Sequence, residues 1–230
     1  MKNQRMVNAP TRILMLTLAR PIAARLACCL LLLGGLAGCA GLVDKPVRAA
    51  LYDFGPGQIT APAPPQSTRP ALVLADIDGA GALDGSAVLY RLGYADEHQL
   101  RPYAQARWSA PPPQLIRQRL REQIGRDRVV LNPGEGAALA RTGGLLPRAL
   151  RIELEEFSHY FRSASESVGL LRLRATLLES TPGGEKVLAQ RNVVVQRPAQ
   201  SADAPGGVRA LTSAVDAAAD ELTQWLATVP

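Results

Sequence analysis

The sequence predicts an α+β domain: a mainly antiparallel sheet of about six strands with two helices packed on one face. Three observations lead to this fold class. Short segments between residues 51 and 195 alternate apolar and polar side chains, as strands with one buried face do. Two longer segments, near 112–125 and 206–228, repeat apolar residues at helical spacing. A helix with an apolar face needs a sheet face to cover, and a parallel doubly wound sheet would need more helices.

The first 38 residues have the charge profile of a signal peptide, with five Lys or Arg residues and no Asp or Glu. An uncharged run follows from Leu26 to Leu36, which is much shorter than the roughly 20 residues that span a bilayer. Ala37 and Gly38 then allow a peptidase to approach the backbone before Cys39. The four residues 36–39 resemble a bacterial lipobox, and the alternative is an ordinary signal peptide with a chance cysteine.

The lipobox predicts cleavage between Gly38 and Cys39, with a covalent diacylglycerol and an N-acyl chain on Cys39 as the membrane anchor. By analogy with other lipoproteins, Ala40 rather than Asp after the cysteine indicates the periplasmic face of the outer membrane. We therefore expect a signal peptide at 1–38, a membrane tether at 39–50 and a periplasmic domain at 51–230. A Pro-rich connector at 57–70 lies within that domain.

Removal of the signal peptide leaves 192 of the 230 residues, with 21 basic and 20 acidic side chains. The whole-chain pI of 9.6 is therefore largely an effect of the signal peptide and does not support nucleic-acid binding. Cys28 and Cys29 leave with that peptide and Cys39 is acylated, so no thiol remains for a disulfide or a metal. The domain must be stabilised by an aliphatic core, and we expect no cofactor.

The first half of the domain contains strands, a glycine-rich loop and one helix. Residues 51–54 and 71–77 predict strands, the second of them buried. Strands are expected at 88–94 and 100–108 around a turn at 96–99, then a helix at 112–125 and a short strand at 129–131; residues 136–147 form either a loop or a weak helix. The helix buries Ile116, Leu120 and Ile124, and its arginines at 117, 119 and 121 are either solvated or attract anionic lipid headgroups.

The second half contains three strands and the closing helix. One-sided alternation predicts a strand at 148–157 and a hairpin of 171–177 with 187–195, whose loop at 181–184 is slightly longer than two residues. The closing helix, 206–228, is capped by Asp203 or a neighbour. Its apolar stripe consists of Leu211, Val215, Ala218, Leu222 and Trp225.

The motifs of common enzymes and nucleotide-binding proteins are missing from the sequence. The glycine-rich loop at 79–85 lacks G-x-G-x-x-G spacing and precedes a strand, so we expect a flexible loop there. His98 falls in a predicted turn, and His159 is interpreted as a surface residue rather than part of a triad. We predict that the protein is not an enzyme.

The string Leu89-Tyr90-Arg91, followed by Tyr103, Arg107-Trp108, prolines and an amphipathic helix, resembles the ABC-type transport auxiliary lipoprotein family, the PqiC-like proteins. The lipobox, the Tyr-x-Phe strand at 52–54, the hairpin and the closing helix follow the same order. The resemblance implies a periplasmic accessory subunit, anchored in the outer membrane, of an ABC/MCE-type lipid-transport system. The alternative is a structural lipoprotein that assists assembly of another outer-membrane or cell-wall complex.

The resemblance also implies partners. These are the membrane through the lipid anchor, an MCE-domain protein and ABC transporter components, with further copies of the chain as an open alternative. Tyr90, Arg91 and Trp108 are the candidate residues for contact with a partner or a lipid. Their alternative role is packing at a sheet edge, with Arg91 paired to a carboxylate.

Overall fold

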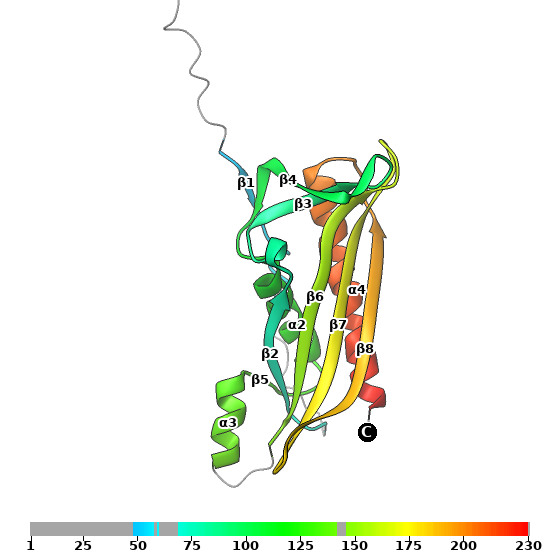
Figure 1. The fold of residues 1–230 in the computed structure, drawn as a ribbon. Coiled ribbons are helices and arrows are strands. Elements are labelled where there is room, and N and C mark those ends of the chain that lie inside the picture. The colour runs from blue at the N-terminus through cyan, green and yellow to red at the C-terminus, as the bar shows by residue number, and fades with distance from the viewer. Residues whose placement is uncertain (1–47, 58, 60–68, 142–145, 230) are drawn as a thin grey trace, which may run out of the picture. The chain divides into compact units, whose positions relative to one another are not determined.

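A computed structural model of the protein describes residues 48–57, 59, 69–141 and 146–229 (Figure 1). The predicted signal peptide 1–38 and its cleavage site at Gly38 and Cys39 lie outside the described residues. Most of the tether 39–50 and of the connector 57–70 lies outside them too. The expectations for these segments therefore stay predictions.

The described residues form one mixed sheet of eight strands with helices beside it, so the α+β class is confirmed and the estimate of about six strands was too low. The strands are β1 Ala50–Tyr52, β2 Leu72–Gly79, β3 Ala87–Leu92, β4 Asp96–Trp108, β5 Val130–Leu131, β6 Arg148–Phe161, β7 Ser167–Thr181 and β8 Gly184–Pro198. The helices are a short 3-10 turn η2 Gly81–Leu83, then α2 Pro112–Ile124, α3 Pro133–Arg141 and α4 Ala204–Thr228.

β6 is the central strand of the sheet. One of its edges pairs in parallel with β2 along its first half and with β3 at its last three residues, while the other edge pairs antiparallel with β7. β1 with β4 and β2 with β5 are parallel as well. The prediction of a mainly antiparallel sheet was wrong, because alternation along a strand indicates its buried face but not the direction of its neighbours.

Two predicted turns were placed or sized incorrectly. β4 begins at Asp96, which pairs with Leu92, and the turn before it closes with a hydrogen bond of 2.9 Å from the Ala95 N–H to the Leu92 carbonyl. The polar residues 96–99 resemble a turn because this end of β4 is exposed. In the hairpin, Thr181 pairs with Gly184, so the loop has two residues and is not longer.

Other boundaries also differ from the predictions. β6 continues to Phe161, four residues beyond the predicted end, and α3 shows that the first part of 136–147 is helical. The helix predicted at 112–125 is confirmed as α2 within one residue. The cap of α4 is confirmed too, since the Asp203 carboxylate accepts a hydrogen bond of 2.8 Å from the Gly206 N–H.

The core lies between the sheet and the two long helices, as the apolar stripes predicted. Ile116, Leu120 and Ile124 of α2 and the α4 stripe except the half-buried Trp225 have at most 1% of their surface exposed. α2 and α4 lie side by side on one face of the sheet (Figure 1), joined by an ion pair of 3.2 Å between Arg119 and Asp216. Among the described residues, no helix has the length and apolar character needed to cross a membrane.

Candidate functional site

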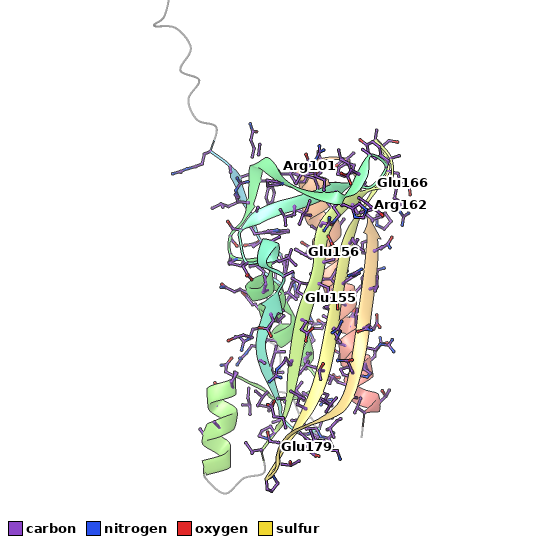
Figure 2. The ribbon with its side chains drawn as sticks, in the orientation of Figure 1. Arg101, Glu155, Glu156, Arg162, Glu166 and Glu179 are labelled. Atoms are coloured by element: carbon purple, nitrogen blue, oxygen red, sulfur yellow. The ribbon has the colours of Figure 1, made fainter. Side chains whose placement is uncertain are left out.

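Arg91 on β3 forms a bidentate ion pair with Glu156 on β6. Its Nε and Nη2 lie 3.1 and 3.0 Å from the two carboxylate oxygens, and Nη1 donates to the carbonyl of Glu97 at 3.1 Å. Glu156 lies where the β6–β7 register shifts, toward the end of the sheet that β3 and β4 cross (Figure 2). Arg91 is therefore paired with a carboxylate, as its alternative role in packing predicted, and the ion pair links β3 to β6.

Trp108 is a core residue, with 2% of its surface exposed. Its ring packs against Phe54 and Phe157 at centroid distances of 5.4 and 5.6 Å. A side chain this buried offers no surface to a partner or a lipid, so the predicted contact role does not fit Trp108. Aromatic residues that can be buried in a core and aromatic residues that bind partners look the same in one sequence.

Tyr90 lies in a separate aromatic group. Its ring is 4.7 Å from that of Tyr103 and 6.1 Å from that of Phe161, and its side chain is partly exposed. Tyr90 and Arg91 are adjacent on β3, so their side chains point to opposite faces of the strand. The structure thus divides Tyr90, Arg91 and Trp108 among an aromatic group, an ion pair and the core, and a contact role remains a prediction for the first two.

Three polar side chains that are joined by hydrogen bonds were missed by the sequence analysis, two of them buried and the third, Tyr103, partly buried. The Tyr103 hydroxyl lies 2.8 Å from His159 Nδ1, and His159 Nε2 lies 2.8 Å from the Ser167 hydroxyl. His159 has no exposed surface, so its interpretation as a surface residue was wrong. The signal available was its position in β6, in step with Phe157 and Phe161, which is the pattern of an inward-facing residue.

Burial controls the protonation of His159 and Tyr103. It lowers the pKa of His159 from 6.5 to about 4, against the opposing effect of the nearby Asp203 carboxylate, and the imidazole is neutral at neutral pH. Burial also raises the pKa of Tyr103 well above its ordinary value. The two hydroxyls satisfy both ring nitrogens, one as donor and one as acceptor. The histidine therefore links β6 to β4 and β7 through its two hydrogen bonds, and its lowered pKa makes it a weak base.

The arginines of α2 bind the protein itself. Arg117 donates to the carbonyls of Leu74 and Ala75 at 3.1 and 3.2 Å, and it shares the Asn132 side chain with Arg121. Arg119 donates to the carbonyl of Phe54 in addition to pairing with α4. These arginines are therefore not simply a solvated face, because the protein's own groups accept hydrogen bonds from all three; attraction of lipid headgroups stays a prediction.

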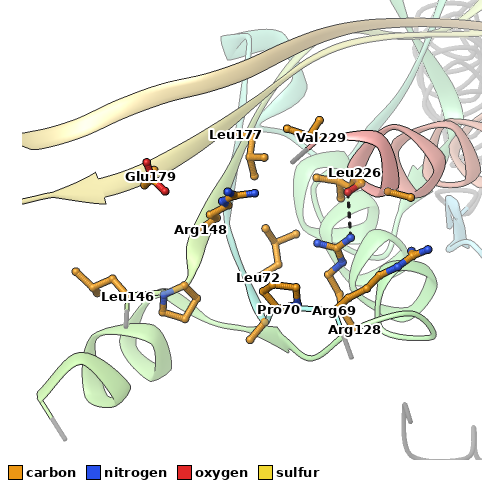
Figure 3. Close-up of a pocket in the computed structure, with 13 residues that line it drawn as sticks. Arg69, Pro70, Leu72, Arg128, Leu146, Arg148, Leu177, Glu179, Leu226 and Val229 are labelled. Carbon is orange, nitrogen blue, oxygen red and sulfur yellow. Dashed lines mark hydrogen bonds between the residues drawn. The ribbon is translucent and has the colours of Figure 1, made fainter. Parts of the chain in front are cut away.

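A cavity of about 520 Å³ opens where α4 ends (Figure 3). It lies at the start of β6, whereas the aromatic group of Tyr90, Tyr103 and Phe161 lies at the other end of that strand. Its walls come from the start of β2, the start of β6, the end of β7 and the end of α4. Leu72, Leu177 and Leu226 form buried parts of these walls, and Leu146 is a half-exposed part. The volume is within the range of small-molecule pockets.

Arg128 lines this cavity, with 9% of its surface exposed. Its Nη2 donates to the Leu226 carbonyl at 3.1 Å, in the last turn of α4, while its Nε has no hydrogen-bond partner among the described residues. Burial and the neighbouring charges of Arg69 and Arg148 lower the pKa of Arg128, against the opposing effect of Asp127. The cavity combines apolar walls with an excess of positive charge, a setting that suits an anion with an apolar part.

The described residues contain no group of three or more His, Cys, Asp or Glu side chains arranged to hold a metal ion. The glycine-rich segment after β2 forms η2, a 3-10 turn that is followed by β3 rather than by a phosphate-capping helix. The described part of the chain has a cavity at the end of α4 and polar side chains engaged in structural contacts.

Comparison with solved structures shows that the fold recurs. A crystal structure of a protein from Xanthomonas campestris matches with a TM-score of 0.59 and 21% identity, covering 77% of this chain and 94% of that chain. A crystal structure of an uncharacterised protein matches with a TM-score of 0.56 and 14% identity, covering 78% and 99%. The comparison with curated proteins found no match. At these identities the two structures show the fold alone.

The family comparison is more specific. The model of the ABC-type transport auxiliary lipoprotein component matches residues 52–223, which run from the end of β1 into the last turns of α4. This range includes Tyr90, Arg91, Trp108 and most of the described sheet. The resemblance found in the sequence is thereby confirmed, and the chain belongs to the ABC-type transport auxiliary lipoprotein family.

Proposed function

We propose that the protein is a lipid-anchored, non-enzymatic accessory subunit of an ABC/MCE-type system that moves lipid across the cell envelope. The observation that carries this proposal is the family match over residues 52–223, because the family is an auxiliary lipoprotein component of ABC-type transport. Lipid as the cargo and an MCE-domain protein as the partner are the finer parts of the proposal. They rest on the residue pattern around Tyr90 and Arg91.

The fate of the polar side chains supports a role without catalysis. His159 is buried beside the start of α4 and is held between the hydroxyls of Tyr103 and Ser167. Arg91 is committed to Glu156, and the α2 arginines to backbone carbonyls. These groups stabilise the fold, and a subunit that acts by binding needs no activated nucleophile.

The anchor is the part of the proposal that lies outside the described residues. Cys39 carries the diacylglycerol and N-acyl chain, cleavage falls after Gly38, and Ala40 directs the protein to the periplasmic face of the outer membrane. Mass spectrometry of the mature N-terminus tests this directly. We expect an acylated Cys39 as the first residue, and an unmodified cysteine or another N-terminus would contradict it.

Co-purification tests the function. The full chain with a C-terminal affinity tag is isolated from membranes as wild type, as Cys39→Ser and as the matched control Cys28→Ser. Cys28 lies in the same signal peptide but outside the lipobox. We expect the wild type and Cys28→Ser to bring down an MCE-domain protein and ABC components, and Cys39→Ser to lose them along with the outer-membrane fraction.

The same preparation separates the two candidate roles. A β-barrel or cell-wall protein in place of the MCE-domain partner would support the structural alternative and overturn lipid transport. Light scattering on the purified particle gives the number of copies per complex, which decides whether the chain forms a homo-oligomer.

A further inference from the structure

The cavity at the carboxyl end of α4 is lined by several charged side chains. Three arginines, Arg69, Arg128 and Arg148, line it together with one carboxylate, Glu179 (Figure 3). Arg69 is paired with Asp127 at 2.6 Å, just outside the lining. With Asp127 counted, the cluster has three basic and two acidic side chains, which gives a net charge of +1.

Among the residues of this cluster, the surroundings of Arg128 give the strongest indication of a ligand. A buried guanidinium is costly unless its charge is compensated and its N–H groups are bonded. The Leu226 carbonyl at the negative end of the α4 dipole satisfies one donor at 3.1 Å. The Nε donor has no partner among the described residues, although the side chain is nine-tenths buried. Nε itself has no accessible surface, so a carboxylate or phosphate in the cavity would compensate the charge of the guanidinium rather than bond Nε.

The remaining walls are apolar. Leu72, Leu177 and Leu226 are almost fully buried, and Leu146, with 49% of its surface exposed, forms part of the wall beside Arg148. An inorganic anion would leave the exposed surface of Leu146 in contact with water, whereas an acyl chain would cover it. The volume of about 520 Å³ is that of a small-molecule site, which favours one acyl chain over a two-chain lipid.

We infer that this cavity binds a single-chain anionic amphiphile, with its carboxylate or phosphate head at Arg128 and its acyl chain along the apolar wall at Leu146 and Val229. The inference deepens the proposed function by naming the class of lipid, and it rests on that function for its biological meaning. The head group contributes charge-assisted hydrogen bonds, and the chain contributes affinity through its buried methylenes.

The test uses the purified mature lipoprotein in phosphatidylcholine nanodiscs and a photoactivatable myristate. Labelled peptides are identified by mass spectrometry, and unlabelled myristate, laurate, myristyl alcohol and inorganic phosphate compete. We expect labels in the segments 69–72, 146–148 or 226–229. Laurate, shorter by two methylenes, should compete about 15-fold more weakly than myristate. The alcohol should compete at least about tenfold more weakly, because it lacks the charge.

Two variants test the site itself. Arg128→Met removes the buried cation, and Leu146→Glu adds a carboxylate to a half-exposed wall without changing the core. Each should weaken competition by myristate about tenfold or more. Arg101→Met is the matched control, because Arg101 lies at the opposite end of the sheet from Glu179 (Figure 2), and it should leave labelling unchanged. If Arg128→Met lowers the melting temperature, Leu146→Glu still decides the question.

Three results would overturn the inference: equal competition by myristate and myristyl alcohol, labels confined to other segments, or unchanged labelling in Leu146→Glu. Competition by inorganic phosphate as strong as that by myristate would identify a plain anion site and overturn the acyl-chain part. The assay contains no transporter component. If labelling fails and co-purification succeeds, the proposed lipid class is wrong and the accessory role stands. If labelling succeeds and co-purification fails, the cavity binds the amphiphile but the accessory role is wrong.

Discussion

His159 Nε2 lies 2.8 Å from the Ser167 hydroxyl, in the layer between β6 and the start of α4. Tyr103 closes the other side of the ring at 2.8 Å, and Gly207 of α4 packs so near that a Cβ there would lie 2.4 Å from Nδ1. Burial lowers the pKa of the imidazole to about 4, so its neutral form is part of the folded state at neutral pH.

Acidification should destabilise the protein through His159. The folded-state pKa is about 4 and the ordinary value is 6.5, so between these values the unfolded chain binds the extra proton. Stability should be fully present above pH 6.5 and fall as the pH drops toward 4, by on the order of 2 to 3 kcal/mol in total. Urea unfolding at a series of pH values from 7.5 to 4 measures this slope.

Two substitutions identify the titrating group. His159→Gln should flatten the dependence between pH 6.5 and 4, at the cost of a lower stability at neutral pH. His98→Gln, at an exposed position of β4, should keep the dependence of the wild type. A slope that persists in His159→Gln would assign it to another group.

Gly169→Ala should destabilise the fold by about 2 to 3 kcal/mol. A Cβ at Gly169 of β7 would lie 2.5 Å from the backbone of Ala210 and Leu211, so α4 would have to move away from the sheet. Gly85→Ala is the control, since nothing lies within 4 Å of its added Cβ, and it should change stability by at most about 0.5 kcal/mol. Thermal unfolding measures both variants. A loss of stability in Gly169→Ala alone indicates close packing against α4, whereas equal losses in both would indicate a general effect of replacing glycine.

The pair Arg91–Glu156 should show a favourable coupling energy. The two side chains are 20% and 15% exposed, so each single change to Met leaves a largely buried charge without its partner. We expect about 2 to 3 kcal/mol of destabilisation for either single variant, and less than the sum of the two for the double variant. A double-mutant cycle measured by urea unfolding gives the coupling, and strict additivity would show that the pair contributes nothing to joining β3 and β6.

Asp203→Ala should lower stability by about 1 kcal/mol, because it removes the side-chain acceptor for the Gly206 N–H at the start of α4. Asp203→Asn should retain most of that stability, since an amide oxygen can accept the same hydrogen bond. Equal losses in the two variants would indicate that the charge of Asp203, rather than the cap, matters.

Local pattern was sufficient where a residue's role depends on its near neighbours. The stripe Leu211 to Leu222 and the cap at Asp203 follow from helical spacing and from the need of the first N–H groups for an acceptor. The β7–β8 hairpin follows from alternation on both sides of a turn. Pairing direction could not be read in this way, because β2 and β6 are parallel neighbours separated by more than 60 residues.

The candidate sites divide along the same line. Trp108 and Tyr90 are similar in sequence terms, and only the packing shows that one is in the core and the other is partly exposed. No sequence motif marks Arg128. Its surroundings are the carboxyl end of α4 and the side chains of Arg69 and Arg148, which come from distant parts of the chain.

The sequence alone determined the lipobox prediction, the family, the two amphipathic helices and the strands that cover them. These depend on short-range spacing of apolar, small and capping residues, which one chain displays directly. The tertiary structure decided the direction of the strands, the burial of His159 and Trp108, and the cavity around Arg128. Burial and charge clustering depend on which distant segments meet, and that is set by the packing of the whole core rather than by any local pattern.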